Sequence, residues 1–273
     1  MSSMKNPHNF FATLKRKINV NKTIYKINTG DRIVTEPRSI LCELKKFYMN
    51  LYKSKRGTNK SKKNPFLNVD LKTLSEEEKE LCEGLVKVDE VKKVLKAMAN
   101  NKSPGSDGYP AEFYKFFWSD IGVYVLNSLN EAFQVGELSQ TQKQGIISLI
   151  PKGDKPREYI KNWRPISLIN VDCKLLSGVL AQRIKKVLPK IIGNEQKGFL
   201  GQRYIGENIR TVYDLMEYLD NKDKSGMLLL LDFEKAFDSI EWDYLNEVLK
   251  SLVLANNLLG GLEFCIKMHV AVL

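Results

Sequence analysis

The stretch from Met227 to Asp238 constrains the fold of this chain more than any other. Five consecutive apolar residues follow Gly226 and end at Asp232. Such an unbroken apolar run is typical of a strand covered on both faces, because a half-exposed strand would alternate. We therefore expect a buried strand at 227–231 with Asp232 at its carboxyl end. A carboxylate held there can offer a hard oxygen ligand to a divalent cation from a rigid support.

Beyond this strand the apolar period becomes helical. Asp238, with Glu241 three residues later, has the spacing of a capping box and predicts that a helix starts there. The face of that helix is expected to carry Ile240, Leu245, Val248, Leu249 and Leu252. Both aspartates also have ordinary structural interpretations, Asp238 as a helix cap and Asp232 as a turn residue at a strand end.

The positive charge is concentrated in the first quarter of the chain. Residues 1–63 hold 16 Lys and Arg against 3 Asp and Glu, whereas the rest of the chain holds 27 against 29. Aromatic residues are interleaved with this basic block, so it fits a surface that binds phosphates and offers stacking faces to nucleic acid. A solvated basic helix or a flexible tail would have the same composition.

Several functional classes are disfavoured by the composition. The 273 residues include four cysteines without paired spacing and only two histidines, so neither a zinc site, nor a disulfide framework, nor histidine catalysis is indicated. No apolar run is long enough to span a bilayer, and the first residues lack a signal-peptide core. We expect an intracellular protein, in the nucleus or cytoplasm, that is neither secreted nor bound to a membrane.

The remaining periodicity is mostly helical. A polar linker is expected at 53–64, and Ser75 followed by three glutamates predicts a helix start. Further helices are expected at 39–52, 91–98, 111–118, 123–133, 175–188 and 209–219.

Three polar segments between these helices are candidates for binding. The loop at 102–108 contains glycines that let backbone N–H groups approach a ligand, although a plain turn explains it equally well. Two short strands, 145–152 and 164–169, predict a hairpin whose Lys152 and Arg164 lie near the base of its loop. These cations suit a triphosphate, or they are simply solvated surface charges. The third segment is the glycine-interrupted loop at 196–203.

Taken together, four stretches resemble the LINE-type (non-LTR retrotransposon) reverse transcriptases, in the order of that family. They are Asn101–Gly108 with Ala111–Lys115, Leu149–Lys152 through Trp163–Leu168, Gln196–Phe199 with Asn208–Arg210, and Leu231–Asp238. The resemblance covers about residues 90–254, and the helix at 40–52 is similar to the segment that precedes this core.

The resemblance implies a role for particular residues. Asp232 would bind two catalytic Mg²⁺ ions with help from the Phe233 carbonyl, and Phe237 would exclude a ribose 2′-hydroxyl. Lys152 and Arg164 would hold the triphosphate of the incoming deoxynucleotide, beside Phe233 and Phe237. The residues that would contact the backbone of the RNA template or DNA primer are Lys102, Ser103, Gly105, Gly108, Gly198, Phe199 and Arg203.

The chain departs from the family pattern after Leu254, where neither the adjacent aspartate pair nor the thumb follows. We therefore expect an α+β fold of reverse-transcriptase fingers and a partial palm, with a helix-rich N-terminal extension and no thumb. The expected domains are a basic arm and helix at 1–66, a fingers region with its extension loop at 67–225, and the first part of the palm at 226–273. Such a chain is expected to be inactive alone. The alternatives are an RNA-binding fragment and a non-functional truncated product.

Overall fold

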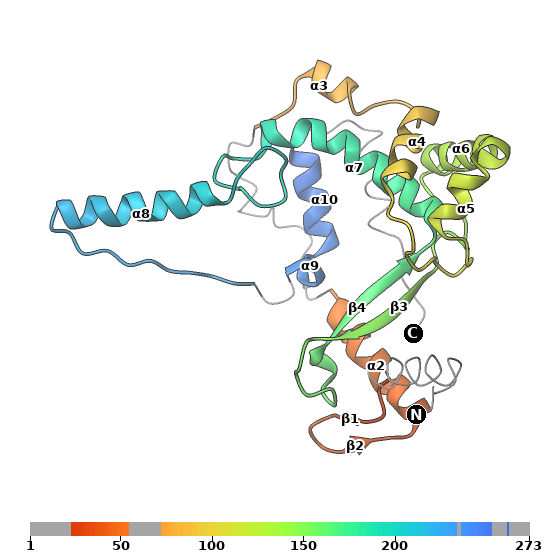
Figure 1. The fold of residues 1–273 in the computed structure, drawn as a ribbon, viewed down its shortest axis with the longest axis horizontal. Coiled ribbons are helices and arrows are strands. Elements are labelled where there is room, and N and C mark those ends of the chain that lie inside the picture. Colours follow the sequence, from red (N-terminus) through yellow and green to blue (C-terminus); the bar gives the residue numbers. More distant parts are fainter. Residues whose placement is uncertain (1–22, 55–71, 234–235, 253–260, 262–273) are drawn as a thin grey trace, which may run out of the picture.

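The computed structural model describes residues 23–54, 72–233, 236–252 and 261, without the side chains of residues 237 and 238. Helices dominate these residues, and the strands form two separate antiparallel hairpins (Figure 1). None of the described helices is both long and apolar enough to cross a membrane. Most of the linker expected at 53–64 lies outside the described residues.

The main hydrophobic core surrounds the long helix α7 (Val171–Ile191). Its apolar stripe packs against α4 (Val88–Ala97) and α6 (Trp118–Val135), while α5 (Ala111–Phe116) joins α4 and α6. The fully buried side chains of this core include Val91, Leu129, Leu175, Leu176 and Val179. The helices predicted from their apolar spacing in this region are confirmed.

The short helix α3 (Glu76–Glu80) begins as the sequence predicts. Ser75 Oγ accepts a hydrogen bond from the Glu78 N–H, and the Glu78 carboxylate accepts one from the Ser75 N–H. This reciprocal pair is a capping box, which satisfies two of the amides that a helix start leaves unpaired.

Arg183 on α7 lies inside the core, although its charge suggested a position on the solvent side. Only 2% of it is exposed. Its guanidinium donates to both carboxylate oxygens of Glu90, at 2.9 and 2.7 Å, and to the carbonyls of Gly84 and Leu85, at 2.7 and 2.9 Å. A buried guanidinium is tolerated because these partners match its planar array of donors.

This ion pair predicts how stability depends on pH. Burial acts to raise the pKa of Glu90, but hydrogen bonds from Arg183 and the Lys87 backbone outweigh it and leave the pKa below its usual value. A lowered pKa in the folded state stabilises the protein above the unfolded pKa of about 4.3, and this contribution is lost as the pH falls through the folded value. Urea unfolding between pH 6 and 3 should show a steeper loss of stability for the wild type than for Glu90→Gln. Equal slopes would contradict this prediction.

The larger hairpin pairs β3 (Gly145–Pro151) with β4 (Trp163–Ile169), in the register Ser148–Ile166 and Ile150–Arg164. Its connecting loop contains the short 3₁₀ turn η2 (Ile160–Asn162). This hairpin confirms the prediction made from its two apolar runs.

A second, smaller core forms at the loop end of this hairpin. It contains β1 (Ile27–Asn28), β2 (Ile33–Val34) and α2 (Pro37–Tyr52), and Leu149 of β3 and Ile160 of η2 pack against it. In Figure 1 these elements lie below the hairpin, on the side away from α7.

The C-terminal elements differ most from the expectation. Helix α8 (Gly206–Asn221) projects away from both cores, and none of its residues is buried (Figure 1). The predicted strand at 227–231 is absent: these residues have no regular structure, and Leu230 is 84% exposed. A strand requires a neighbour for its backbone hydrogen bonds. Within the described part of the chain no strand pairs with this segment, because the strands pair as β1–β2 and β3–β4.

The helix expected to start at Asp238 is divided into two. Residues 236–239 form the short helix α9 (Ala236–Ser239), and α10 (Trp242–Ser251) begins after Glu241. Asp238 is therefore inside α9 and does not cap a longer helix. Leu249 and Leu252 pack against the main core, as the predicted face requires, whereas Ile240 is exposed.

Candidate nucleotide and nucleic-acid site

The hairpin β3–β4 places its two predicted phosphate ligands on one face. Arg164 lies opposite Ile150 in the ladder, and Lys152 follows Ile150 by two residues. Because side chains alternate along a strand, Arg164 and Lys152 fall on the same side of the hairpin. This is the open side: Ile146, Ile150 and Ile166 are exposed there, while the other side turns Leu149 into the second core.

The two cations differ in their surroundings. The Lys152 ammonium donates to the Lys161 carbonyl at 2.8 Å, and the Lys152 N–H donates to the Asn162 carbonyl at 2.8 Å. Lys152 is therefore held near the loop base, where two of its three ammonium donors remain available. Arg164 is exposed. This arrangement can present one fixed and one adaptable positive charge to an anion.

The loop at 102–108 is anchored by Asn170, at the junction of β4 and α7. Asn170 is only 2% exposed, and its Oδ1 accepts from the Ser106 hydroxyl at 3.3 Å and the Asp107 N–H at 3.4 Å. Its Nδ2 donates to the Thr141 carbonyl at 3.1 Å. Sequence reasoning did not find Asn170, because an asparagine just before a long helix suggests an N-cap. In the structure its side chain tethers the loop instead.

Gly105 is the residue of this loop that lies directly against Asn170. A Cβ at Gly105 would lie 2.1 Å from Asn170 Oδ1 and 2.6 Å from the carbonyl carbon of Ile169, so only glycine fits. Gly108 has a φ of +79°, which glycine also accommodates best. Lys102 and Ser103 lie on the exposed part of the loop.

Buried or half-buried ionisable groups lie in this loop and beside it. Burial raises the pKa of Asp107 and the nearby Asp172 raises it further, against the lowering effect of the Tyr109 N–H bond. Burial likewise raises the pKa of Tyr114, with Asp172 and Asp107 adding to the effect. Asp172 accepts a hydrogen bond from the largely buried Gln142 at 2.9 Å. Asp107 of the loop thus interacts electrostatically with Asp172 of α7 and Tyr114 of α5.

Arg203 stabilises the loop at 196–203 through hydrogen bonds to backbone carbonyls. Its guanidinium donates to the carbonyls of Gly193 at 2.5 Å, Gln196 at 2.8 Å and Ile192 at 3.0 Å, near the end of α7. Most of its donors are thus used within the protein. Gly198 lies in the same loop, and Phe199, with a φ of +64°, is 94% exposed.

Asp232 and Phe233 lie in the exposed segment that follows Leu231. Within the described residues, no ion pair or hydrogen bond joins Asp232 to Lys152 or Arg164. Phe237 belongs to α9, and its side chain lies outside the described part. The structure therefore brings Lys152 and Arg164 together but does not add Asp232 to them.

The described residues do not fit a magnesium site. Mg²⁺ requires near-octahedral oxygen ligands, usually with one or two carboxylates. Around Asp232 the structure shows no such set, because the described part of the chain holds no group of three or more His, Cys, Asp or Glu side chains suited to a metal ion. No catalytic step through a metal follows from these residues.

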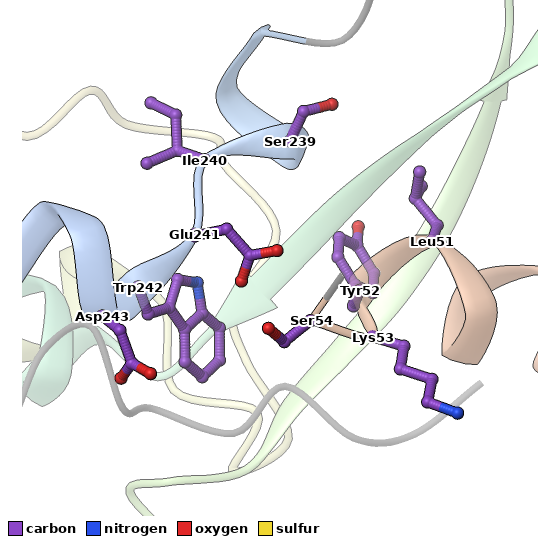
Figure 2. A pocket seen from close by; sticks show the side chains of 9 residues that line it. All are labelled: Leu51, Tyr52, Lys53, Ser54, Ser239, Ile240, Glu241, Trp242 and Asp243. Atoms are coloured by element: carbon purple, nitrogen blue, oxygen red, sulfur yellow. The ribbon is translucent and has the colours of Figure 1, made fainter. Parts of the chain in front are cut away.

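A pocket of about 200 Å³ lies between α2 and the C-terminal helices. It is lined by the end of α2 and the start of α10: Leu51, Tyr52, Lys53, Ser54, Ser239, Ile240, Glu241, Trp242 and Asp243. Figure 2 shows the Glu241 and Ser54 side chains in the space between the rings of Tyr52 and Trp242. The pocket marks a junction between the N-terminal helix and the C-terminal elements.

Comparison with known proteins identifies the family. Residues 150–268 match the family model described as reverse transcriptase (RNA-dependent DNA polymerase). That range begins in the hairpin and includes Asp232. Over this range the chain is similar to reverse transcriptases.

Three relatives illustrate how far this similarity extends. A transposon TX1 uncharacterized 149 kDa protein of Xenopus laevis is 33% identical over 255 residues, which is 93% of this chain and 19% of the relative. A probable RNA-directed DNA polymerase from transposon X-element of Drosophila melanogaster is 28% identical, over 67% of this chain and 21% of the relative. The RNA-directed DNA polymerase from mobile element jockey of Drosophila funebris is 26% identical, over 57% and 17%. The chain spans about a fifth of the length of these curated relatives. The chain belongs to the LINE-type reverse transcriptases.

Membership of the family confirms the resemblance to LINE-type reverse transcriptases, and the mixed helix-and-strand structure is consistent with a reverse-transcriptase domain. Reverse transcriptases act on a nucleic-acid template with nucleotide substrates and generally use a divalent metal. The roles expected for individual residues of this chain remain predictions.

Proposed function

We propose that this chain supplies the fingers and the beginning of the palm of an RNA-directed DNA polymerase. The observation that carries the proposal is the open face of β3–β4, where Lys152 and Arg164 lie together within the range that matches the family. An arginine fork and a lysine point charge are a suitable pair for a triphosphate. In this proposal 67–225 corresponds to the fingers region and 226–273 to the first part of the palm. An intracellular location in the nucleus or cytoplasm accords with it.

The template and primer are proposed to pass the loops on either side of the hairpin. Lys102 and Ser103 are exposed on a loop that Asn170 and Gly105 hold in place, so a phosphate backbone would meet a preorganised surface. Phe199 offers an exposed ring for stacking. Arg203 is proposed to act indirectly, by shaping the loop that carries Gly198 and Phe199.

We further propose that Asp232 and the Phe233 carbonyl become Mg²⁺ ligands only together with carboxylates that the described residues do not provide. The chain alone is then expected to give no product in a primer-extension assay with Mg²⁺ and deoxynucleotides. Extension by the purified chain, abolished by Asp232→Asn, would contradict this expectation. Phe237 is proposed as the gate against ribonucleotides.

Binding of an RNA template annealed to a DNA primer tests the proposed function directly. Affinity should fall linearly with the logarithm of salt concentration, because phosphate contacts release counterions. Lys102→Glu should weaken binding and reduce the salt dependence. Lys185→Ala, at an exposed position in the C-terminal half of α7, should leave both the affinity and its salt dependence unchanged. Binding that is absent at low salt, or insensitive to salt, would refute the proposal.

A second candidate function is RNA binding without polymerisation. It is favoured by the strong positive charge of positions 1–63, which hold 16 basic and 3 acidic residues. Single-stranded RNA bound as tightly as the primer–template, with no contribution from Lys102, would favour this candidate over the first.

A further inference from the structure

Helix α2 contacts the hairpin through a buried face. Ile40, Leu44 and Tyr48 are four residues apart, lie on one side of α2 and are all buried. Leu149 of β3 and Ile160 of η2 pack against the cluster that they form with β1 and β2. The hairpin and α2 therefore share one hydrophobic core.

The loop of the hairpin is also fixed by polar contacts from the N-terminal side. The Asn28 N–H of β1 donates to the Glu158 carbonyl at 2.8 Å, and the Lys26 ammonium pairs with the Glu158 carboxylate at 2.9 Å. From the hairpin itself, the indole of the buried Trp163 donates to the Arg157 carbonyl at 2.7 Å. The loop that ends at Lys152 and Arg164 is thus held from two directions.

The other end of α2 reaches the C-terminal elements. Leu51, Tyr52 and the two residues after them line the same pocket as residues 239–243, and α2 lies against α9 (Figure 2). Only three residues separate Asp232 from the start of α9. A single helix of 16 residues, about 24 Å long at 1.5 Å per residue, therefore joins the β3–β4 hairpin to α9 and the start of α10.

We propose that α2 is a positioning strut, which fixes the separation between the Lys152–Arg164 face and helices α9 and α10, the first of which carries Phe237. The inference rests on the proposed function for the meaning of this separation. Its physical basis is independent, because closely packed interiors transmit displacements and a functional site needs rigid support. The residues that act are Ile40, Leu44 and Tyr48, which contact no substrate and work through the elements they hold.

Hydrogen–deuterium exchange of the full chain tests the strut. Leu44→Ala removes a buried side chain from the α2 face, and Leu41→Ala, half-exposed on the same helix, is the matched control. We expect Leu44→Ala to speed exchange about tenfold in the loop 152–162 and in residues 236–251, which corresponds to a loss of about 1.4 kcal/mol of local stability. Exchange in α7 at 171–191 should stay at the wild-type rate, and Leu41→Ala should change neither region.

Ile40→Val is measured alongside as a milder truncation of the same face, because Leu44→Ala could unfold the whole chain. For either variant, faster exchange within α2 with wild-type exchange in 152–162 and 236–251 overturns the proposal. An equal increase across α7 with Ile40→Val overturns it as well. The measurement is made without nucleotide, so a chain that fails to bind primer–template would refute the proposed function without affecting this result.

Discussion

Replacing Arg183 with alanine is expected to lower the free energy of unfolding by about 3–5 kcal/mol, because it leaves a largely buried carboxylate without its partner. The Glu90 side chain is only 26% exposed, and Arg183 supplies hydrogen bonds to both of its oxygens. The carbonyls of Gly84 and Leu85 would lose their donors in the same change. Each unpaired polar group adds to the cost of folding.

Urea denaturation followed by far-UV circular dichroism measures this effect. Lys185→Ala is the matched control, since Lys185 is exposed on the same helix and its replacement should change the stability by no more than about 0.5 kcal/mol. If Arg183→Ala unfolds at the same urea concentration as Lys185→Ala, the guanidinium does not hold α4 and α7 together as described.

Gly105→Ala is expected to displace the loop at 102–108 and to cost about 1–3 kcal/mol of stability, the range typical of overpacking. The added methyl group would meet the backbone nitrogen of Asn170 at 2.4 Å, and backbone atoms cannot move aside as a flexible side chain can. The loop would lose its hydrogen bonds to Asn170, so Lys102 and Ser103 would no longer be held in one place.

Two measurements test the effect of Gly105→Ala. Thermal unfolding should show the loss of stability, and primer–template affinity should fall by about tenfold or more if the loop is part of the interface. Ser103→Ala, on the exposed part of the same loop, should leave the melting temperature unchanged. Wild-type stability in Gly105→Ala would show that the loop does not rest on Asn170.

Local patterns predicted most of the helices because those helices bury a regular stripe. The stripe of α7 and the helix start after Ser75 are properties of neighbouring residues, and both formed as expected. The prediction of a strand at 227–231 was wrong, because a strand depends on residues that are distant in the sequence. Its apolar run requires a partner strand, and among the described residues no strand pairs with it.

The part of the candidate site that depends on the pairing register of β3 and β4 could be predicted from the sequence. Pairing Ile150 with Arg164 places Lys152 and Arg164 on one face, and alternation along the two strands is enough to infer it. The contacts of Asn170, Arg183 and Arg203 were not predictable, because polar side chains that bond to distant backbone atoms leave no periodic signal in the sequence.

Photolabelling with an azido-deoxynucleoside triphosphate tests the central claim most directly, because it asks whether the open face of β3–β4 binds the substrate. We predict that the labelled peptides fall within residues 145–169, and that Arg164→Ala reduces the labelling strongly while the exposed Arg38→Ala on α2 does not. Labelling spread over the chain, or labelling of the hairpin that is insensitive to Arg164→Ala, would contradict the assignment of this face to the triphosphate.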